Sequence, residues 1–388
     1  MTQVVILGGG VCGLWIRALL WQAGISTVLV SKGPLGGGQT IGSQGILHAG
    51  LKYAADGLSH EISRQLATCR DIWLSSMNRG QPLDLRNVRV LSAKTHFWTS
   101  GGMLDRAVGT AAAAVMKAGA RRLPRPEFPA AFANAPDSVG VWEVDEEVVD
   151  PASLVESLRH LPGGRILTTD DEPRLVKHER GATVDVDGER FDAEHSVVAA
   201  GVGNESLLTA ANVDASLKCQ RRPLHMLFAS GVPHRVFGHC LQLSDKPRLT
   251  ITTGEHGGDH SGELVWYIGG DVAEKGVGRN PAEQIEAGRA EIQHALPWID
   301  QSAFRWGTFS IDRAEGKQPS GNRPDGPVLC KGPDFTAIWP TKLAMAPAAA
   351  SMVSSAILER LQVGPREPQT PSAANAAPIA TPPWAGGV

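Results

Sequence analysis

The hydrophobic positions of the first 30 residues predict one β-α-β unit. Residues 4 to 7 form a short, continuous and mostly β-branched apolar run, which is typical of a parallel strand buried on both faces. Residues 14 to 23 then place apolar side chains at helical spacing, and Gly24 follows as a helix stop. Residues 26 to 30 are a second apolar strand. This order predicts the start of a parallel sheet.

Weaker patterns along the rest of the chain predict a second sheet and several more helices. Helical spacing recurs in residues 59 to 77, 104 to 118, 281 to 296 and 346 to 361. Strands are expected in residues 86 to 148, 196 to 201 and 219 to 267, with a solvated antiparallel hairpin at 181 to 188. Residues 363 to 388 are rich in Pro and Ala without apolar periodicity, so we expect a disordered tail there.

Composition narrows the class of protein. The 388 residues are enough for two domains. The 37 basic and 40 acidic residues nearly balance, so no global field favours nucleic acid or an anionic membrane. No apolar stretch reaches the ~18 residues of a membrane span, and no cationic leader precedes the first strand. The five cysteines are scattered without a C-x-x-C pair, so we expect a reducing, cytoplasmic location and no metal site.

A glycine-rich turn joins the first strand to the first helix. Gly8, Gly10 and Gly13 fit the G-x-G-x-x-G pattern in the context that it requires, between a strand and a helix. The first glycine permits a tight turn, the second lets backbone amides approach a pyrophosphate, and the third allows the helix to pack closely on the strand. With Val11 and Cys12 at the helix start, these residues are predicted dinucleotide contacts.

The end of the second strand departs from the dinucleotide-binding pattern. A carboxylate normally bonds the ribose hydroxyls there, but this chain has Ser31 and Lys32. A basic residue at this place favours the extra phosphate of NADP, whereas the Ser31 hydroxyl can bond an FAD ribose. The strand end alone leaves both cofactors open.

The stretch from Gly38 to Tyr53 carries the pattern T-x-x-x-x-G-x-x-H-x-G-x-x-Y. It resembles the flavin-contacting segment of L-2-hydroxyglutarate oxidases and FAD-dependent glycerol-3-phosphate dehydrogenases, within the D-amino-acid-oxidase-like superfamily. Gln44 stands where that family has asparagine. The resemblance implies FAD as the cofactor, with contacts from Gln39, Thr40, Ser43, Gln44 and Gly45. We expect noncovalent attachment, since Cys330 matches no flavin-linking cysteine.

His48 is the candidate catalytic base of this stretch. A neutral imidazole beside a flavin can take the proton of a substrate hydroxyl while the α-hydrogen leaves as hydride. A histidine that only positions the flavin is the alternative. Tyr53, at the end of the same pattern, is a candidate for substrate binding.

Three later segments extend the resemblance. Residues 144 to 151 are similar to the segment in which the superfamily chain returns to the cofactor domain, and residues 197 to 201 to its second FAD strand. This similarity implies cofactor contacts at Ala200 and Gly201. Arg323 lies in a stretch similar to the G-x-R-P segment of amino-acid and glycine oxidases, where the arginine holds the substrate carboxylate. A planar guanidinium can donate two parallel hydrogen bonds to such a carboxylate.

Two further cations complete the candidate site. Arg221 and Arg222 lie on an expected strand, where neighbours face opposite sides, so at most one enters a pocket, and Arg222 is the candidate substrate ligand. In the superfamily a glycine-rich turn opens the last helix at the flavin, but residues 339 to 347 lack those glycines. Lys342, followed by Leu343, is expected to place positive charge near the flavin instead.

The resemblance implies an α/β (α+β) fold, in which a Rossmann-like FAD-binding domain is interleaved with an antiparallel-sheet substrate domain. We expect residues 1–85, 149–218 and 305–362 in the first domain, and 86–148 and 219–304 in the second. The implied reaction is hydride transfer to flavin N5 from a small carboxylate-bearing substrate, with a 2-hydroxy acid as first choice. Oxygen, a quinone or a carrier would then accept the electrons.

Three alternatives stay open. An amine or amino acid becomes the better substrate if His48 only positions the flavin. A flavin-binding protein without turnover is compatible with the departures at Ser31 and in residues 339 to 347. An NADP-dependent reductase would rest on Ser31 and Lys32 alone. Hydrolase, phosphate-transfer and metal mechanisms have no support, because no G-x-S-x-G, P-loop or H-E-x-x-H pattern occurs.

Overall fold

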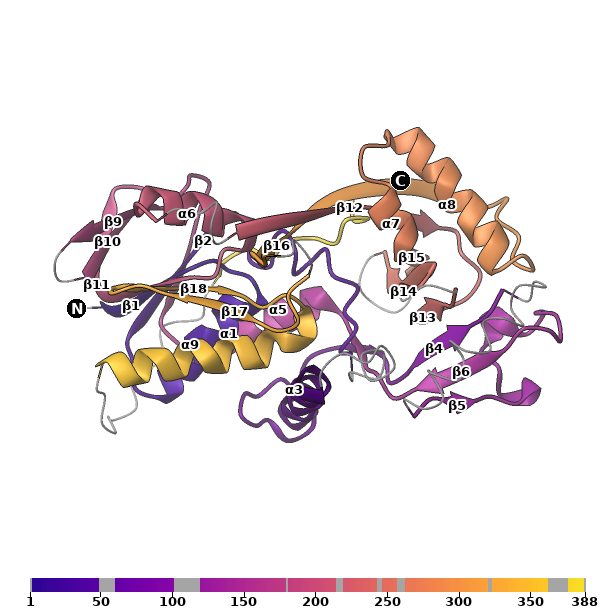
Figure 1. Ribbon diagram of the computed structural model, residues 1–388, viewed down its shortest axis with the longest axis horizontal. Coiled ribbons are helices and arrows are strands. Elements are labelled where there is room, and N and C mark those ends of the chain that lie inside the picture. Colours follow the sequence, from indigo (N-terminus) through magenta and orange to yellow (C-terminus); the bar gives the residue numbers. More distant parts are fainter. Residues whose placement is uncertain are drawn as a thin grey trace.

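The computed structural model describes residues 2–48, 60–100, 119–178, 181–213, 219–242, 246–256, 262–319, 323–361 and 376–386. Within these ranges the chain forms two eight-stranded sheets and one two-stranded sheet, and Figure 1 shows the two large sheets in two bodies side by side. No helix in this part of the chain is long and apolar enough to cross a membrane. The predicted helix at 104–118 and Tyr53 lie outside the described residues.

The first sheet is the predicted Rossmann-like core. Its strands lie in the order β17 (Val328–Lys331), β18 (Phe335–Trp339), β11 (Glu189–Val198), β1 (Thr2–Leu7), β2 (Thr27–Lys32) and β8 (Arg165–Thr169). All neighbours from β18 to β8 are parallel, whereas β17 is antiparallel to β18. β10 (Gly181–Val186) forms the predicted hairpin with β11, and β9 (Arg174–His178) extends it. Because β1 is buried on both faces, its apolar run is continuous.

Both faces of the first sheet are covered. α1 (Val11–Gln22), α5 (Pro151–His160) and α9 (Ala346–Leu361) share one apolar core with β1, and α3 (His60–Arg79) packs against α9. The hairpin and α6 (Asn204–Ala210) contribute to the core on the opposite face. The α/β fold class predicted from the sequence is confirmed by this arrangement of layers.

The second sheet is mixed. Its strands lie in the order β16 (Arg305–Gly316), β12 (Cys219–Ser230), β15 (Leu264–Gly269), β14 (Leu249–Glu255), β13 (Gly238–Cys240), β4 (Thr95–Trp98), β6 (Val141–Val144) and β5 (Arg121–Arg122). All pairs are antiparallel except β13 with β4. α7 (Asp271–Lys275) and α8 (Pro281–Ala295) pack on β12, and the short strands β3 (Val90–Ser92) and β7 (Val148–Val149) pair separately.

A long two-stranded ribbon connects the two bodies. β12 and β16 pair from Cys219 with Gly316 to Ser230 with Arg305, and Figure 1 shows them running from one body into the other. At its first-sheet end the ribbon places Ala314 in the core beside β18. Residues 305–316 fall within the segment 305–362 that is predicted for the FAD-binding domain. Their backbone hydrogen bonds instead go to β12, so this strand belongs to the second sheet.

Residues 376–386 pack against the rest of the protein. The Leu35 N–H donates to the Pro378 carbonyl at 2.8 Å, and the Ala380 N–H donates to the Leu35 carbonyl at 2.9 Å. Trp384 is buried, with its ring centroid 5.2 Å from that of Tyr267. The predicted disorder is therefore wrong for this stretch. Backbone hydrogen bonds to Leu35 and the packing of the Trp384 ring keep this segment in place, and neither contact produces a periodic pattern in the sequence.

Replacing Trp384 with alanine should lower the free energy of unfolding by about 3 kcal/mol, because the change leaves a cavity against Tyr267. Urea unfolding at a fixed FAD concentration, followed by circular dichroism, measures the effect. Met352→Ala, at an exposed position of α9, is the control and should change stability by less than about 0.5 kcal/mol. Equal midpoints for the two variants would show that the C-terminal segment does not contribute to stability.

Candidate active site

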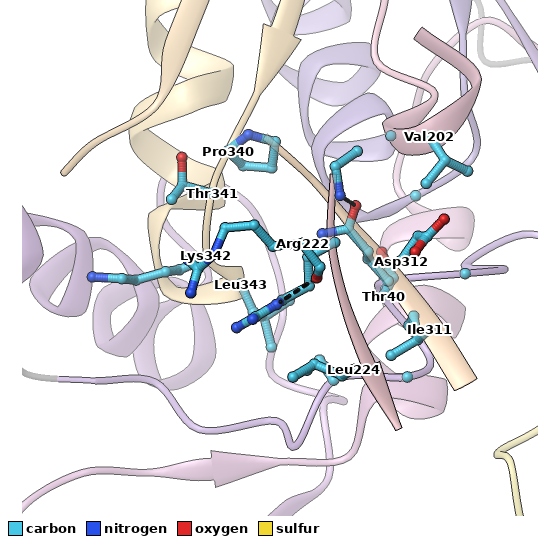
Figure 2. A pocket seen from close by; sticks show the side chains of 18 of the residues that line it. Thr40, Val202, Arg222, Leu224, Ile311, Asp312, Pro340, Thr341, Lys342 and Leu343 are labelled. Carbon is cyan, nitrogen blue, oxygen red and sulfur yellow. Dashed lines mark hydrogen bonds between the residues drawn. The ribbon is translucent and has the colours of Figure 1, made fainter. Parts of the chain in front are cut away.

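A large cavity opens where the two sheets meet. Its volume is about 1540 Å³, and its walls come from the turn after β1, the loop of residues 33–48, the end of β11 and the β12–β16 ribbon. Figure 2 shows Leu224 and Ile311, a cross-strand pair of the ribbon, together with Lys342 and Leu343, which line the same cavity. The cavity therefore joins segments that are far apart in the sequence.

Backbone crowding explains the glycines of the first turn. Gly8 has a φ of +124°, and a Cβ there would lie 2.4 Å from the Ala199 carbonyl oxygen. A Cβ on Gly13 would lie 2.0 Å from the Gly8 carbonyl oxygen. At the start of α1, the Val11 N–H donates to Thr40 Oγ1 at 3.1 Å. The turn thus brings β1, α1 and β11 together at the cavity wall, with Gly13 packed behind it.

Two glutamines tie the loop of residues 33–48 to the ribbon and the second sheet. Gln39 Oε1 accepts a hydrogen bond from the Ala314 N–H at 2.9 Å. Gln44 Nε2 donates to the carbonyls of Thr250 and Tyr267, at 2.9 and 3.0 Å. The amide of Gln44 is therefore engaged with the backbone of the second sheet. Gln44 and its neighbours Ser43 and Gly45 all line the cavity.

A carboxylate does stand beside the end of β2, although it comes from another strand. Lys32 Nζ lies 2.9 Å from Glu172 Oε2, and Glu172 follows the neighbouring strand β8. Ser206 donates to the other oxygen of Glu172 at 2.6 Å. The hydrogen bond that Lys32 donates to Glu172 raises the pKa of Lys32. Ser31, Lys32 and Glu172 all line the cavity, so this edge offers the carboxylate that the sequence pattern lacked.

The turn after β18 contains a threonine in a left-handed conformation. Thr341 has a φ of +67°, and its hydroxyl donates to the Gly326 carbonyl at 2.8 Å. A left-handed conformation costs energy for a residue with a side chain, and this hydrogen bond offsets part of the cost. Lys342 follows and is 9% exposed, and its carbonyl accepts from Met345 in the short helix η6 (Leu343–Met345). The turn therefore holds a buried lysine at the cavity wall.

Three arginines and two glutamates meet on the ribbon wall. Arg222 lies 3.4 Å from one oxygen of Glu315 and 3.5 Å from one of Glu274. Arg313 donates to the same Glu274 oxygen at 3.2 Å. Arg323 Nε lies 3.9 Å from Glu315 and is buried without a hydrogen-bond partner among the described residues. Glu315, fully buried, organises two of the three guanidinium groups.

This wall carries more positive than negative charge. The three arginines, Lys342 and Lys246 line the cavity together with Glu274, with which Lys246 also pairs. Glu315 is buried and pairs with Arg222 and Arg323. Burial, and then the charges of Arg222 and Arg323, lower the pKa of Arg313, although its pairing with Glu274 opposes this shift. An anion bound here would relieve the repulsion among the arginines. The wall therefore suits an anionic group of a ligand.

Only one of the two neighbouring arginines on β12 lines the cavity, as the alternation of a strand predicts. Arg222 does so, whereas Arg221 is exposed and pairs with Glu205 and Asp312 at 3.0 and 3.2 Å.

A second polar cluster contains His48. Its Nδ1 atom lies 3.6 Å from Glu146 Oε2, and its ring lies 5.9 Å from the ring of His239. The His48 side chain is 33% exposed, whereas Glu146 and His239 are buried. No site role is predicted from the sequence for either partner. Glu146 lies in residues 144–151, which the resemblance links only to the return of the chain to the cofactor domain, and His239 matches no motif.

The sequence-predicted residues and the cavity wall overlap widely. The wall includes Gly8, Gly10, Val11, Cys12, Ser31, Lys32, Gln39, Thr40, Ser43, Gln44, Gly45, His48, Ala200, Gly201, Arg222, Arg323, Lys342 and Leu343. Tyr53 lies outside the described residues. Wall residues that no sequence signal indicated are Glu172, His239, Glu274 and Arg313.

The wall has the room and the polar groups that FAD requires. Ser43 Oγ and Trp339 Nε1 are buried without a hydrogen-bond partner among the described residues, and both residues line the cavity. Buried polar atoms of this kind are normally satisfied, here by a polar ligand. Burial raises the pKa of Cys12 to about 12, so a neutral thiol stands beside the glycine turn. The cavity also exceeds the ~1,000 Å³ of larger small-molecule sites, which leaves room for a dinucleotide.

Comparison with known proteins agrees with this geometry. The family described as FAD dependent oxidoreductase matches residues 3–339. A probable FAD-dependent oxidoreductase of Pseudomonas aeruginosa is 36% identical over 389 residues, which cover 99% of this chain and 97% of the relative. The crystal structure of an FAD-dependent oxidoreductase from the same species has a TM-score of 0.82 and 34% identity, covering 99% of this chain and 97% of that one.

More distant structures share the fold alone. Glycine oxidase from Geobacillus kaustophilus has a TM-score of 0.64 and 15% identity, covering 92% of this chain and 95% of its own. An L-α-glycerophosphate oxidase from Mycoplasma pneumoniae with FAD bound has a TM-score of 0.66 and 14% identity, covering 95% and 96%. With the family match over most of its length, the glycine turn and the cavity wall described above, this chain belongs to the FAD-dependent oxidoreductase family.

Proposed function

We propose that this FAD-dependent oxidoreductase oxidises a small carboxylate-bearing substrate, with a 2-hydroxy acid as first choice. The observation that carries the proposal is the cationic wall of Arg222, Arg313 and Arg323 in the same cavity as His48. Guanidinium groups bind a carboxylate through two parallel hydrogen bonds, and an imidazole accepts a hydroxyl proton. A molecule with both groups on adjacent carbons is a 2-hydroxy acid.

The cavity wall also supports an assignment of cofactor-holding residues. The glycine turn after β1 would hold the pyrophosphate, where backbone amides at a helix start favour an anion. Ser31 or Glu172 would bond the ribose at the end of β2. Thr40, Ser43 and Lys342 would contact the flavin, with Lys342 supplying positive charge that favours its reduced form. Noncovalent attachment remains part of the proposal.

In this proposal each group of the chain has one task. The arginines hold the substrate carboxylate and so orient the α-carbon. His48 takes the proton of the substrate hydroxyl, and the substrate alcohol is oxidised to a ketone. FAD, when bound, supplies the acceptor for the hydride at its N5 atom, and oxygen, a quinone or a carrier later takes the electrons.

An amino acid is the second candidate substrate. It presents the same carboxylate to the arginines, and the fold is shared with glycine oxidase. The difference lies at the neighbouring carbon. An amino acid carries an amine there in place of the hydroxyl, so a neutral amine requires no base that removes a hydroxyl proton.

We propose a cytoplasmic location, supported by five cysteines that are all free thiols.

Anaerobic mixing of the yellow protein with 2-hydroxy acids, amino acids and glycerol 3-phosphate tests the substrate class. Bleaching of the flavin band at about 450 nm by a 2-hydroxy acid is the expected outcome, since hydride transfer reduces the flavin. Bleaching only by an amino acid would transfer the proposal to the second candidate. A flavin that no compound bleaches would favour a binding protein without turnover.

Ser43→Ala should raise the Kd for FAD about 5- to 10-fold, because the change removes one hydrogen-bond donor from the cavity wall. Titration of the apoprotein with FAD, followed by flavin fluorescence, measures it. Ser354→Ala is a matched control, since its hydroxyl is also buried without a hydrogen-bond partner among the described residues but lies on α9 away from the cavity wall. Equal Kd values for the two variants would exclude Ser43 as a cofactor contact.

Arg222→Gln should raise the KM for the hydroxy acid that reduces the flavin about 10- to 100-fold, because a charged hydrogen bond to the substrate carboxylate is lost. Glutamine keeps an amide beside Glu315, which limits damage to the buried carboxylate. Arg221→Gln removes the same charge one residue away on the outer side of β12 and should leave KM unchanged. Steady-state kinetics of both variants, at equal FAD content, separate substrate binding from a general loss of charge.

A further inference from the structure

A buried carboxylate lies directly behind His48. Glu146 follows β6 and is 3% exposed, and its Oε2 atom lies 3.6 Å from His48 Nδ1. The hydroxyl of Thr95, on β4, donates to the same oxygen at 3.2 Å. A buried carboxylate is costly unless hydrogen bonds or a positive charge stabilise it. Glu146 therefore favours a proton on the nitrogen of His48 that faces it.

The two nitrogens of His48 have different surroundings. Nδ1 faces Glu146, which is held in place by Thr95. The His48 side chain is one third exposed and lines the cavity, so Nε2 is the nitrogen left to meet a ligand. The partner of one imidazole nitrogen decides which of the two carries the proton in the neutral ring. A proton held on Nδ1 leaves the Nε2 lone pair free for a substrate.

Aromatic contacts limit rotation of the imidazole. The ring of His239 stacks on His48 at 5.9 Å with an interplanar angle of 27°, and Phe97 lies on His239 at 5.1 Å. His239 is itself fixed by a contact of 2.9 Å between its Nδ1 and Thr250 Oγ1. Both histidines line the cavity. The stack therefore restricts the plane of the His48 ring, and in that plane Nδ1 lies toward Glu146.

We propose that Glu146 is a positioning residue that sets the tautomer of His48 and stabilises its imidazolium during turnover. This inference rests on the proposed function of His48. The O–H bond of the substrate breaks and its proton forms an N–H bond at Nε2, while the α-hydrogen leaves with its electron pair. The substrate thus loses one proton and one hydride and becomes a ketone. The positive charge gained by His48 then lies beside the carboxylate of Glu146.

The first test observes the tautomer and needs no substrate. Nitrogen-15 NMR of histidine-labelled holoenzyme distinguishes a protonated from an unprotonated ring nitrogen, and the His48 signals are those lost in His48→Asn. In the wild type at alkaline pH we expect the proton on Nδ1. Glu146→Leu should move it largely to Nε2. The same Nδ1 tautomer in both proteins would overturn the inference.

The second test uses the rate of flavin bleaching with the acid found in the substrate panel. Glu146→Gln keeps the shape and the bond from Thr95, so it should fold, and it should slow bleaching about 100-fold with little change in KM. Glu146→Asp, which keeps the charge, should recover part of the rate. Glu147→Gln is the control, because its carboxylate pairs with Arg70 instead and its loss should not affect the rate.

The outcomes separate the two proposals. Normal bleaching by His48→Asn would remove the proposed role of His48 itself. A slow His48→Asn with a fast Glu146→Gln would remove only the role of Glu146. One possible ligand atom from each of His48, Glu146 and His239 also lies within 4.8 Å of the other two. Metal analysis of the holoenzyme is therefore included, and one tightly bound divalent ion per chain, lost in Glu146→Gln, would overturn the inference.

Discussion

The close approach of three backbone segments at Gly8 is the constraint on which the rest of the site depends. A Cβ at Gly8 would lie 2.4 Å from Ala199, and one at Gly13 would lie 2.0 Å from Gly8, so side chains at either position would push β1, α1 and β11 apart. Their absence lets the helix start and the end of β11 meet at one place. The cavity begins there, and every other wall is arranged around it.

The second sheet must be held over this place, and a small number of contacts does so. Gln39 bonds to the β12–β16 ribbon, and Gln44 bonds to β14 and β15. The Tyr267 hydroxyl donates to the Gly42 carbonyl at 2.9 Å, and Trp384 packs against the Tyr267 ring. The loop after β2 and the C-terminal segment therefore connect the two bodies. Since the cavity lies between them, these contacts also fix its width.

Charge inside the cavity is divided between two polar regions. The ribbon wall carries the arginines, which are held apart and oriented by Glu274 and Glu315. His48 belongs to a separate cluster with Glu146 behind it. An anion-binding region and a proton-accepting group within one cavity are what oxidation of a hydroxy acid requires. In both regions a buried glutamate orients the cationic or titratable side chain that faces the ligand.

The sequence by itself determined the fold class, a dinucleotide site and much of the cavity wall, whereas FAD as the dinucleotide was implied by the family resemblance. This was possible because β1, the glycine turn and α1 are contiguous, so local periodicity and steric demands at Gly8 and Gly13 are visible in the chain. Only the tertiary structure showed that Glu172 supplies a carboxylate at β2, that Thr341 adopts a left-handed turn, and that residues 376–386 are ordered. Arg313 reaches the cavity, and Glu146 reaches His48, only through the pairing of distant strands. Such pairing leaves no local pattern, because it depends on contacts between segments that are far apart in the sequence.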